Sequence, residues 1–481
     1  MKKPTRISSR ILERLPAGDL LNADRRLEQE LAFCNQKIVV LDDDPTGVQT
    51  VHDVLVYTDW RTETLIRAFE ESNRIFFILT NSRGMTVPQT EKAHREIAAA
   101  IDAAARSTGK DFILVSRSDS TLRGHYPLET ALLRDELEAL GQPPFDGEII
   151  YPFFKEGGRF TLGNVHYVKE RDELVPAGQT EFARDRSFPY HSSNLVAWCE
   201  EKSNGTLTAN QVTCISLEDL RTQNYEKIIA QLMAVQGFGK VIVNSADYVD
   251  VKVFVAAFLG ALRQGKRFLF RSASAVPKVI GGVEDRPLLS REEMVPAENQ
   301  NGGIVIAGSH VNKTTQQLDA LKNSGIPLEF IEFNQHLVVV PGGLEWEVQR
   351  VSVLAQEKIS AGRSVVVYTR RDRLDLPDAD ADRQLEISMR ISDAVTSVIA
   401  GLMVRPGFII AKGGITSSDV GTKALKVRRA VVLGQISPGI PVWRLGAESK
   451  FPGMPYVIFP GNVGDRDTLR KIVEALIPPV K

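Results

Sequence analysis

The chain has 481 residues, more than a single hydrophobic core usually supports, so we expect two or three domains. Lysine and arginine together number 59 against 60 acidic residues, and this balance gives no global reason to expect binding to nucleic acid or to an anionic membrane. No apolar run reaches the ~18 residues of a membrane span, and residues 1–16 lack the apolar core of a signal peptide. The three cysteines are far apart, as in neither a disulfide framework nor a zinc site. We therefore expect a cytoplasmic protein.

Strand-like and helix-like segments alternate in the first half. Short runs rich in Val, Ile and Phe predict buried strands at residues 37–41, 74–79, 112–115 and 148–151. Helical periodicity predicts helices at residues 62–71, 89–105 and 128–140. This alternation is typical of a parallel sheet covered by helices. Residues 159–235 are less periodic, and the sequence does not place their elements.

The same alternation restarts in the second half. Strands are predicted at residues 304–307, 328–331, 364–368 and 408–411, and helices at 313–323, 345–359 and 387–403. A stretch rich in Pro, Glu, Asn and Gly at residues 284–303 predicts a linker. We therefore predict an α/β protein of two domains, each a mostly parallel sheet flanked by helices, with the active site in the cleft between them. The predicted parts are an extension at 1–36, a first domain at 37–283, the linker, and a second domain at 304–481.

Polar residues follow each predicted strand of the first half. Ligands of open α/β sheets bind beyond the carboxyl ends of the strands, so these loops are candidates for a site. Arginine can pair with a carboxylate through a planar fork, whereas Asp, Ser and Thr can bond hydroxyls, so the content suits an anionic polyol. Each loop alone is explained equally well by turns and helix caps, but four such loops on one edge favour a binding site. The candidates are Asp43, Asp44, Arg83, Asp119, Ser120, Thr121, Arg123, Gly124, His125 and Arg159.

Loops of the second half resemble a phosphate-binding cradle. Paired glycines allow backbone N–H groups to approach an anion, and a helix that opens at residues 416–419 would direct its free N–H groups at that anion. Glycine-rich turns between strand and helix also occur without ligands. The nucleotide-binding candidates are Ser309, Gly413, Gly414, Ile415, Thr416, Ser417, Gly461 and Gly464.

Familiar catalytic motifs are absent from the sequence. It has no G-x-x-x-x-G-K-[ST], G-x-G-x-x-G, G-x-S-x-G or H-E-x-x-H pattern. The seven histidines show no metal-ligand spacing, and only His125 and His310 remain as site candidates. The sequence assigns no metal ligand by spacing.

At these same loops the chain resembles the four-carbon acid sugar kinase family, formerly a domain of unknown function. The resemblance covers nearly the whole chain. Its motifs are Asp43-Asp44-Pro45-Thr46-Gly47, Ser82-Arg83, Asp119-Ser120-Thr121-Leu122-Arg123-Gly124, Gly158-Arg159, Gly308-Ser309, Gly413-Gly414-Ile415-Thr416-Ser417, Pro438-Gly439-Ile440-Pro441 and Gly461-Asn462-Val463-Gly464. Pro45, Arg117, His125 and Ile415 stand where the family commonly has other residues, which leaves the exact substrate open.

The resemblance implies a sugar-binding N-terminal domain, a nucleotide-binding C-terminal domain, and transfer of the ATP γ-phosphoryl group to a hydroxyl, typically terminal. The implied substrates are sugar acids such as threonate, erythronate or an oxo-tetronate. With Mg²⁺ as the accompanying ion, Asp44 is our first choice as general base and Asp43 the alternative, although either could instead orient a hydroxyl or help to hold Mg²⁺. We expect Arg123 to bind the substrate carboxylate.

Two other readings remain open at this point. One is a sensor or effector-like protein that binds ligand without catalysis, and the other is an enzyme that isomerises or dehydrates a sugar acid. Extra length before residue 37 and within residues 163–190 would either cover the site or support an oligomer such as a homodimer.

Overall fold

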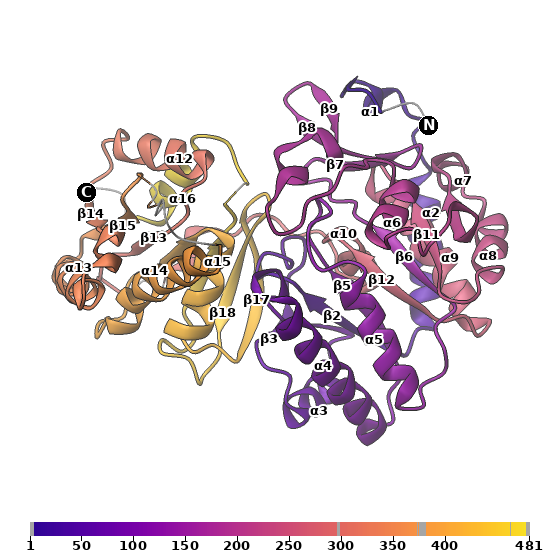
Figure 1. The fold of residues 1–481 in the computed structure, drawn as a ribbon, viewed down its shortest axis with the longest axis horizontal. Coiled ribbons are helices and arrows are strands. Elements are labelled where there is room, and N and C mark those ends of the chain that lie inside the picture. The colour runs from indigo at the N-terminus through magenta and orange to yellow at the C-terminus, as the bar shows by residue number, and fades with distance from the viewer. Residues whose placement is uncertain (1–3, 296–298, 373, 375–380, 462, 478–481) are drawn as a thin grey trace. The chain divides into compact units, whose positions relative to one another are not determined.

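The computed structural model describes residues 4–295, 299–372, 374, 381–461 and 463–477. The chain divides into two compact units between Asp285 and Arg286 (Figure 1). Each unit has its own sheet and its own helices, so the two-domain α/β class expected from the sequence is confirmed. Among the described helices, none has both the length and the apolar character needed to cross a membrane.

The first unit is built on a sheet of parallel strands in the order β10-β11-β6-β12-β5-β2-β4-β3. Their bounds are β2 Lys37–Asp42, β3 Val54–Tyr57, β4 Ile75–Leu79, β5 Phe112–Arg117, β6 Gly147–Tyr151, β10 Val212–Ile215, β11 Gly239–Val243 and β12 Phe268–Ser272. Because these strands are parallel, their carboxyl ends lie along one edge, where open α/β sheets bind ligands.

Helices connect these strands as the alternation predicts. They are α1 Ile11–Arg14, α2 Leu20–Ala32, α3 Thr62–Glu70, α4 Val87–Thr108, α5 Leu128–Ala139, α6 Leu195–Lys202, α7 Leu217–Arg221, α8 Tyr225–Met233, α9 Tyr248–Arg263 and α10 Ala275–Ile280, with 3₁₀ turns at Ser82–Gly84, Ala177–Gln179, Glu181–Arg184 and Ala209–Gln211. Helix α4 is longer than predicted. It begins with a capping box between Thr86 and Gln89 and ends at Gly109, whose φ of 63° supplies the left-handed cap.

A small antiparallel sheet explains part of the stretch that the sequence could not place. Its order is β1-β9-β8-β7, with β1 at Ile7–Ser8, β7 at Arg159–Leu162, β8 at Val165–Glu170 and β9 at Glu173–Pro176. These strands are short and joined by tight turns, so they have neither helical periodicity nor long apolar runs. The sheet brings β1 of the N-terminal extension against β9.

The second unit has a mixed sheet in the order β17-β18-β19-β16-β13-β15-β14. Strands β19, β16, β13, β15 and β14 are parallel, whereas β17 and β18 run antiparallel to their neighbours. The strands are β13 Ile304–Ala307, β14 Leu328–Phe333, β15 Ser364–Thr369, β16 Ile409–Lys412, β17 Arg429–Ser437, β18 Ile440–Leu445 and β19 Pro455–Phe459. The four strands predicted here are confirmed, and β17, β18 and β19 were not predicted.

The helices of the second unit are α11 Arg291–Met294, α12 Asn312–Lys322, α13 Gly343–Ser360, α14 Ala381–Gly401, α15 Gly414–Asp419 and α16 Thr468–Leu476, with a 3₁₀ turn at Gln335–Val339 and a π-helical turn at Val420–Ala424. Helix α15 begins at Gly414, before the predicted opening at residues 416–419. Leu289 and Met294, from the predicted linker, are buried in the core of this unit.

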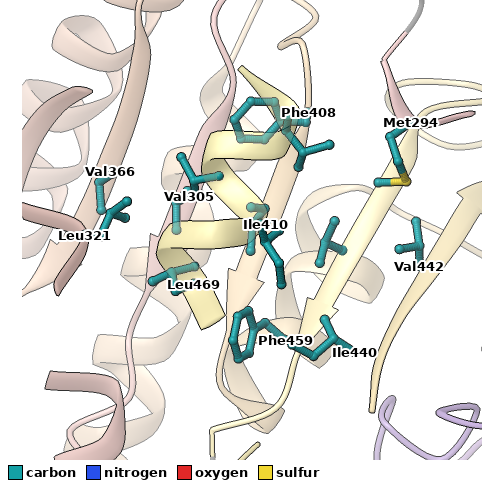
Figure 2. Packing of buried hydrophobic residues seen from close by; sticks show 14 of the residues in the cluster. Met294, Val305, Leu321, Val366, Phe408, Ile410, Ile440, Val442, Phe459 and Leu469 are labelled. Atoms are coloured by element: carbon teal, nitrogen blue, oxygen red, sulfur yellow. The ribbon is translucent and has the colours of Figure 1, made fainter. Parts of the chain in front are cut away.

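Apolar side chains on one face of this sheet, together with α12 and α16, form a core cluster of the second unit. Figure 2 shows Val305 of β13, Ile410 of β16 and Phe459 of β19 among the buried side chains, with Leu469 of α16 packed on the same cluster. Each of these four side chains is 1% exposed or less. Buried apolar packing therefore fixes the positions of β13, β16 and β19, the strands that lead into the glycine-rich loops.

Shortening a side chain at the centre of this core should destabilise the second unit. We expect Ile410→Ala to lower the free energy of unfolding by about 2–5 kcal/mol, because it removes buried methylene groups and leaves a cavity. The measurement is urea denaturation followed by the fluorescence of Trp443, which is 1% exposed. Val353→Ala on α13, where Val353 is 54% exposed, is the control. A loss below about 1 kcal/mol for Ile410→Ala would show that the site collapses around the smaller residue.

Candidate functional site

Charged residues lie at or shortly after the carboxyl ends of three neighbouring parallel strands of the first unit. Asp42 is the last residue of β2, with Asp43 and Asp44 directly after it, and Arg117 is the last residue of β5. Arg83 lies in the 3₁₀ turn after β4, reached through Asn81 in the left-handed conformation with a φ of 57°. The strand order β5-β2-β4 makes these three ends adjacent.

Arg117 holds three consecutive carboxylates together. Its Nη1 donates to Asp42 Oδ1 at 3.1 Å and to Asp43 Oδ1 at 3.2 Å, and lies 3.6 Å from Asp44 Oδ1. The Arg117 side chain is 4% exposed. Carboxylates this close repel one another, and burial withholds water, so the guanidinium is the charge that keeps the group together.

Arg83 joins this cluster to the loop after β5. It pairs with Asp44 through Nη2, with Asp119 Oδ1 at 3.2 Å, and with Asp43 Oδ2 at 3.8 Å through Nη1. The backbone N–H of Asp119 also donates to Asp43 Oδ2 at 3.1 Å. The structure thus brings four predicted residues, Asp43, Asp44, Arg83 and Asp119, into one network.

Asp119 binds the next predicted arginine. Arg123 donates to Asp119 Oδ2 from Nε at 2.8 Å, and its Nη1 reaches Asp185 Oδ2 at 3.4 Å. Thr121 also donates to Asp119 from its backbone N–H and its hydroxyl. Burial alone would raise the pKa of Asp119, but Arg123 and Arg83 outweigh it and hold that pKa well below its usual range. Arg123 thus already has two carboxylate partners within the protein.

Arg159, at the start of β7, has a different environment. No ion pair is found for it within the described ranges, and its Nε is buried without a hydrogen-bond partner. Burial lowers the pKa of its guanidinium, with Asp119 opposing that shift and Arg123 adding to it. The guanidinium carbon lies 5.7 Å from the centre of the Phe182 ring, which Arg123 also approaches, at 5.2 Å. Among Arg83, Arg117, Arg123 and Arg159, therefore, Arg159 is the one for which the described residues show no carboxylate partner, which leaves it capacity for an external anion.

The remaining predicted residues border the network. The backbone carbonyl of Ser120 accepts a bond from His166 Nε2 at 2.8 Å, and His125 Nε2 bonds the carbonyl of Met85 at 3.0 Å. Gly124 has a φ of 112°, and a Cβ there would lie 3.7 Å from Asp43 Oδ2. The carbonyl bond of His125 gives this ring a structural role.

The structure adds three residues that sequence reasoning did not select. The sequence places Asp42 and Arg117 in the loops after the predicted strands but does not mark them as candidates; in the structure they are the last residues of β2 and β5. Glu129, in the first turn of α5, accepts a hydrogen bond from Ser82 Oγ and lies 3.7 Å from His94 Nε2. Nothing local in the sequence marks Glu129, because its partners come from other elements.

Asp42 is the most confined carboxylate of the cluster. A Cβ on Gly47 would lie 2.0 Å from Asp42 Oδ1, so only glycine fits beside it. Burial raises the pKa of Asp42 to about 7; Arg117 opposes the shift, and Asp43 adds to it. The group therefore stores a proton in the folded protein at mildly acidic pH.

Three loops at the carboxyl ends of β13, β16 and β19 meet in the second unit, where small residues let them approach closely. A Cβ on Gly308 would lie 2.8 Å from Thr416 Oγ1, and one on Gly413, where φ is 117°, would lie 3.1 Å from Ser309 Cβ. A Cβ on Gly461 would lie 3.8 Å from Ser309 Oγ. The structure thus brings together four of the predicted nucleotide-binding residues: Ser309, Gly413, Thr416 and Gly461.

Other nucleotide candidates have structural partners or point outward. Ser417 Oγ donates to the Ala411 carbonyl at 2.8 Å, and Ile415 is 69% exposed. Gly464 has a φ of 82°, and a Cβ there would be 2.7 Å from Thr468, so its conformation fits the turn into α16. Gly414 begins α15, a helix too short to supply much dipole. Asn462 lies outside the described residues.

Two cations stand at these loops without a carboxylate partner among the described residues. Lys412, the last residue of β16, donates from Nζ to the Pro460 carbonyl at 2.7 Å. Arg371, after β15, donates from Nη2 to the Ser309 carbonyl at 2.8 Å, and its Nη1 is buried without a partner. Arg370, in contrast, pairs with Asp372 at 3.1 Å. A phosphate group is the kind of anion that this pair of cations can bind.

Comparison with known proteins assigns each unit a domain family. The sugar-binding N-terminal domain matches residues 38–280, half of the chain, and the nucleotide-binding C-terminal domain matches residues 304–469. The chain therefore belongs to the four-carbon acid sugar kinase family, which combines these two domains. Comparison with curated protein sequences gives no match.

Solved structures agree on the fold. A Salmonella typhimurium LT2 protein with a provisional tRNA synthase name aligns with a TM-score of 0.61 at 16% identity, over 90% of this chain and 98% of its own. A Haemophilus influenzae protein of the DUF1537 family aligns with a TM-score of 0.56 at 17% identity, over 92% of this chain and 100% of its own. At these identities the likeness shows the fold alone.

The stored proton on Asp42 makes stability depend on pH. The pKa of this carboxyl is about 7 in the folded protein against an ordinary value of 3.8, so between these limits the folded state holds a proton that the unfolded chain has released. The contribution of Asp42 to stability therefore falls as pH rises through this window, by at most about 1.4 kcal/mol per pH unit.

Asp42→Asn cannot release this proton. Relative to wild type, we expect its free energy of unfolding to rise by on the order of 1 kcal/mol or more between pH 5 and pH 7.5, measured by urea denaturation at each pH. Asp135→Asn, whose side chain is 52% exposed in the wild type, controls for an ordinary surface carboxylate. Parallel pH profiles for wild type and Asp42→Asn would contradict the raised pKa.

Proposed function

We propose that the chain is an ATP-dependent kinase that phosphorylates a hydroxyl of a small sugar acid, such as threonate, erythronate or an oxo-tetronate. The observation that carries the proposal is the network of the first unit, where an arginine without a carboxylate partner adjoins a group of carboxylates beside strand ends. Such a site can bind an acid through its charge and a polyol through its hydroxyls. The nucleotide-binding domain supplies the second substrate.

Arg159 is the residue we propose for the substrate carboxylate. Its position beside Arg123 and Asp119 places it at the network, and its half-buried guanidinium offers a planar fork. Arg123, our choice from sequence, would act mainly by fixing Asp119, since its donors already serve Asp119 and Asp185. The substrate hydroxyls would then meet the oxygens of Asp119 and Asp44.

Asp44 remains our choice as general base. Its side chain is 12% exposed, whereas that of Asp43 is 2% exposed and accepts donors from Arg117 and Asp119. Thr46 donates to Asp44 Oδ1 from its backbone N–H at 2.8 Å, which orients the carboxylate. Asp44 can therefore accept a proton from a hydroxyl, while Asp43 serves to hold the network.

Positioning and neutralisation of charge supply most of the catalysis in phosphoryl transfer. In the second unit, Lys412 and Arg371 would compensate phosphate charge at the three loops, and Ser309 and the glycines would allow close approach. Transfer further requires that the substrate hydroxyl come into line with the γ-phosphate.

The chemistry of the carboxylates also suits Mg²⁺. Asp42, Asp43 and Asp44 offer oxygens within 4.8 Å of one another, the hard ligands that this ion takes. Arg83 and Arg117 already neutralise much of their charge, so the more exposed Asp44 is the carboxylate that would most simply hold the ion. When bound, Mg²⁺ neutralises charge on the transferred group.

The experiment that tests the proposal is a coupled assay of ADP release over a panel of four-carbon sugar acids. We expect acid-dependent release with at least one member. Release that no acid stimulates would favour the sensor or effector-like protein, and conversion of an acid without ATP consumption would favour an isomerase or dehydratase.

Replacing the proposed base should reduce turnover. Asp44→Asn keeps the shape and removes the proton acceptor, and we expect kcat to fall by more than about tenfold, a barrier increase above about 1.4 kcal/mol. Steady-state kinetics with saturating ATP measures it, and Asp135→Asn serves as the surface control. Turnover that stays within tenfold of wild type would exclude Asp44 as the base.

Substitutions of Arg159 and Arg123 should change different kinetic parameters. Arg159→Lys keeps the charge and loses the fork, so we expect the KM for the sugar acid to rise about tenfold or more while the KM for ATP changes little. For Arg123→Lys we expect losses in kcat and in thermal stability, because Asp119 loses its bidentate partner. A larger sugar-acid KM effect for Arg123→Lys than for Arg159→Lys would return the carboxylate-binding role to Arg123.

A further inference from the structure

Lys412 is a buried lysine in the second unit whose charge has no counter-ion among the described residues. Its residue exposure is 0%, and it ends the parallel strand β16, directly before Gly413. Buried ammonium groups are costly to charge unless they are paired and hydrogen-bonded. Packing in the core therefore does not explain why a lysine occupies this position.

Among the described residues, the polar and aromatic partners of the ammonium are the adjacent loop and one ring. Nζ donates to the Pro460 carbonyl at 2.7 Å and approaches the Gly461 carbonyl at 3.4 Å. It also lies 3.9 Å from the centre of the Phe459 ring, which belongs to the core cluster seen in Figure 2. Two carbonyls and a ring can orient an ammonium, but they do not neutralise it.

Those carbonyls belong to the loop that closes the glycine cradle. A Cβ on Gly461 would lie 3.8 Å from Ser309 Oγ and 3.9 Å from Gly413 Cα, so Lys412 links the end of β16 to the place where the three loops meet. Its link to Gly461 also explains how a loop after β19 keeps its place beside a loop after β13. Lys412 thus has the geometry of a positioning residue.

The charged surroundings of Lys412 are positive. Burial, with a smaller contribution from Lys313 of α12, lowers its pKa to about 6. From β15, Arg371 reaches the same group of loops through the Ser309 carbonyl. The described residues of β19 and its loop contribute the Phe459 ring and the two carbonyls, none of which is charged. A bound anion would add negative charge beside Lys412 and so favour its protonated form.

We propose that Lys412 is the positioning residue through which the cradle takes up a nucleotide phosphate, and that it becomes protonated when the nucleotide binds. The inference rests on the proposed function, since it deepens the role of the same nucleotide site. The phosphate supplies the counter-charge that the protein lacks, while the two carbonyl bonds keep the loop at Gly461 in place. Because anion binding favours the charged form of a nearby amine, binding and proton uptake are linked.

Calorimetry of ADP binding to the full chain tests this inference. At pH 7.5, titrations in HEPES and in Tris buffer, both free of phosphate, differ by the heat of any proton exchanged, and we expect wild type to take up more than about half a proton per ADP. Residual protons on ADP itself would be released on binding to a cation, so they cannot mimic uptake. Lys358→Met on α13 is the control and should match wild type.

Two variants separate charge from structure. Lys412→Arg carries a permanent charge, so it should bind ADP with little or no proton uptake. Lys412→Met should weaken ADP binding by about tenfold or more, an effect of about 1.4 kcal/mol. If circular dichroism shows that Lys412→Met does not fold, the comparison of wild type with Lys412→Arg decides.

The possible outcomes distinguish a failure of this inference from a failure of the proposed function. ADP binding by wild type without proton uptake, or uptake that persists in Lys412→Arg, overturns the inference and leaves the proposed function standing. A folded Lys412→Met that binds ADP as tightly as wild type does the same. A wild-type chain that does not bind ADP at all overturns the proposed function together with the inference.

Discussion

The first unit depends on one guanidinium. Arg117 contacts Asp42, Asp43 and Asp44 from a single nitrogen, and its charge offsets the repulsion of three consecutive carboxylates at a buried edge. Its place at the end of β5, next to β2, follows directly from the parallel register. Arg83 pairs in turn with Asp119, and this ion pair connects the three carboxylates to the residues proposed to contact the substrate.

In the second unit, by contrast, two of the basic residues at the site have no carboxylate partners among the described residues. Its loops approach so closely that a side chain on Gly308 or Gly413 would strike a neighbour, and the cations beside them, Lys412 and Arg371, bond carbonyls instead of carboxylates. The first unit therefore compensates most of its own charge, whereas the second leaves positive charge for a ligand. This difference agrees with a sugar-binding domain joined to a nucleotide-binding domain.

Sequence patterns could predict the features that are local. The strand that became β2 and the polar residues that follow it were visible because a buried strand is apolar and its terminal loop is not. The antiparallel strands β17 and β18 were missed: β17 is only partly buried and is interrupted by register shifts, and β18 is buried at nearly every position, so neither shows a clear alternation of apolar and polar residues. The roles of Arg117, Glu129 and Lys412 depend on partners far along the chain, so no local pattern could separate them from strand or helix residues. The carboxylate partners of Arg123 likewise include Asp185, which lies 62 residues further along the chain, so the sequence does not show that Arg123 is paired while Arg159 is not.

The most direct test of the central claim is to identify the product. Phosphorus NMR of the protein incubated with ATP, Mg²⁺ and a four-carbon sugar acid should show a new phosphate monoester resonance that grows with ADP and requires the acid. A resonance for inorganic phosphate alone, or spectra identical with and without the acid, would contradict the assignment of the chain as a sugar acid kinase.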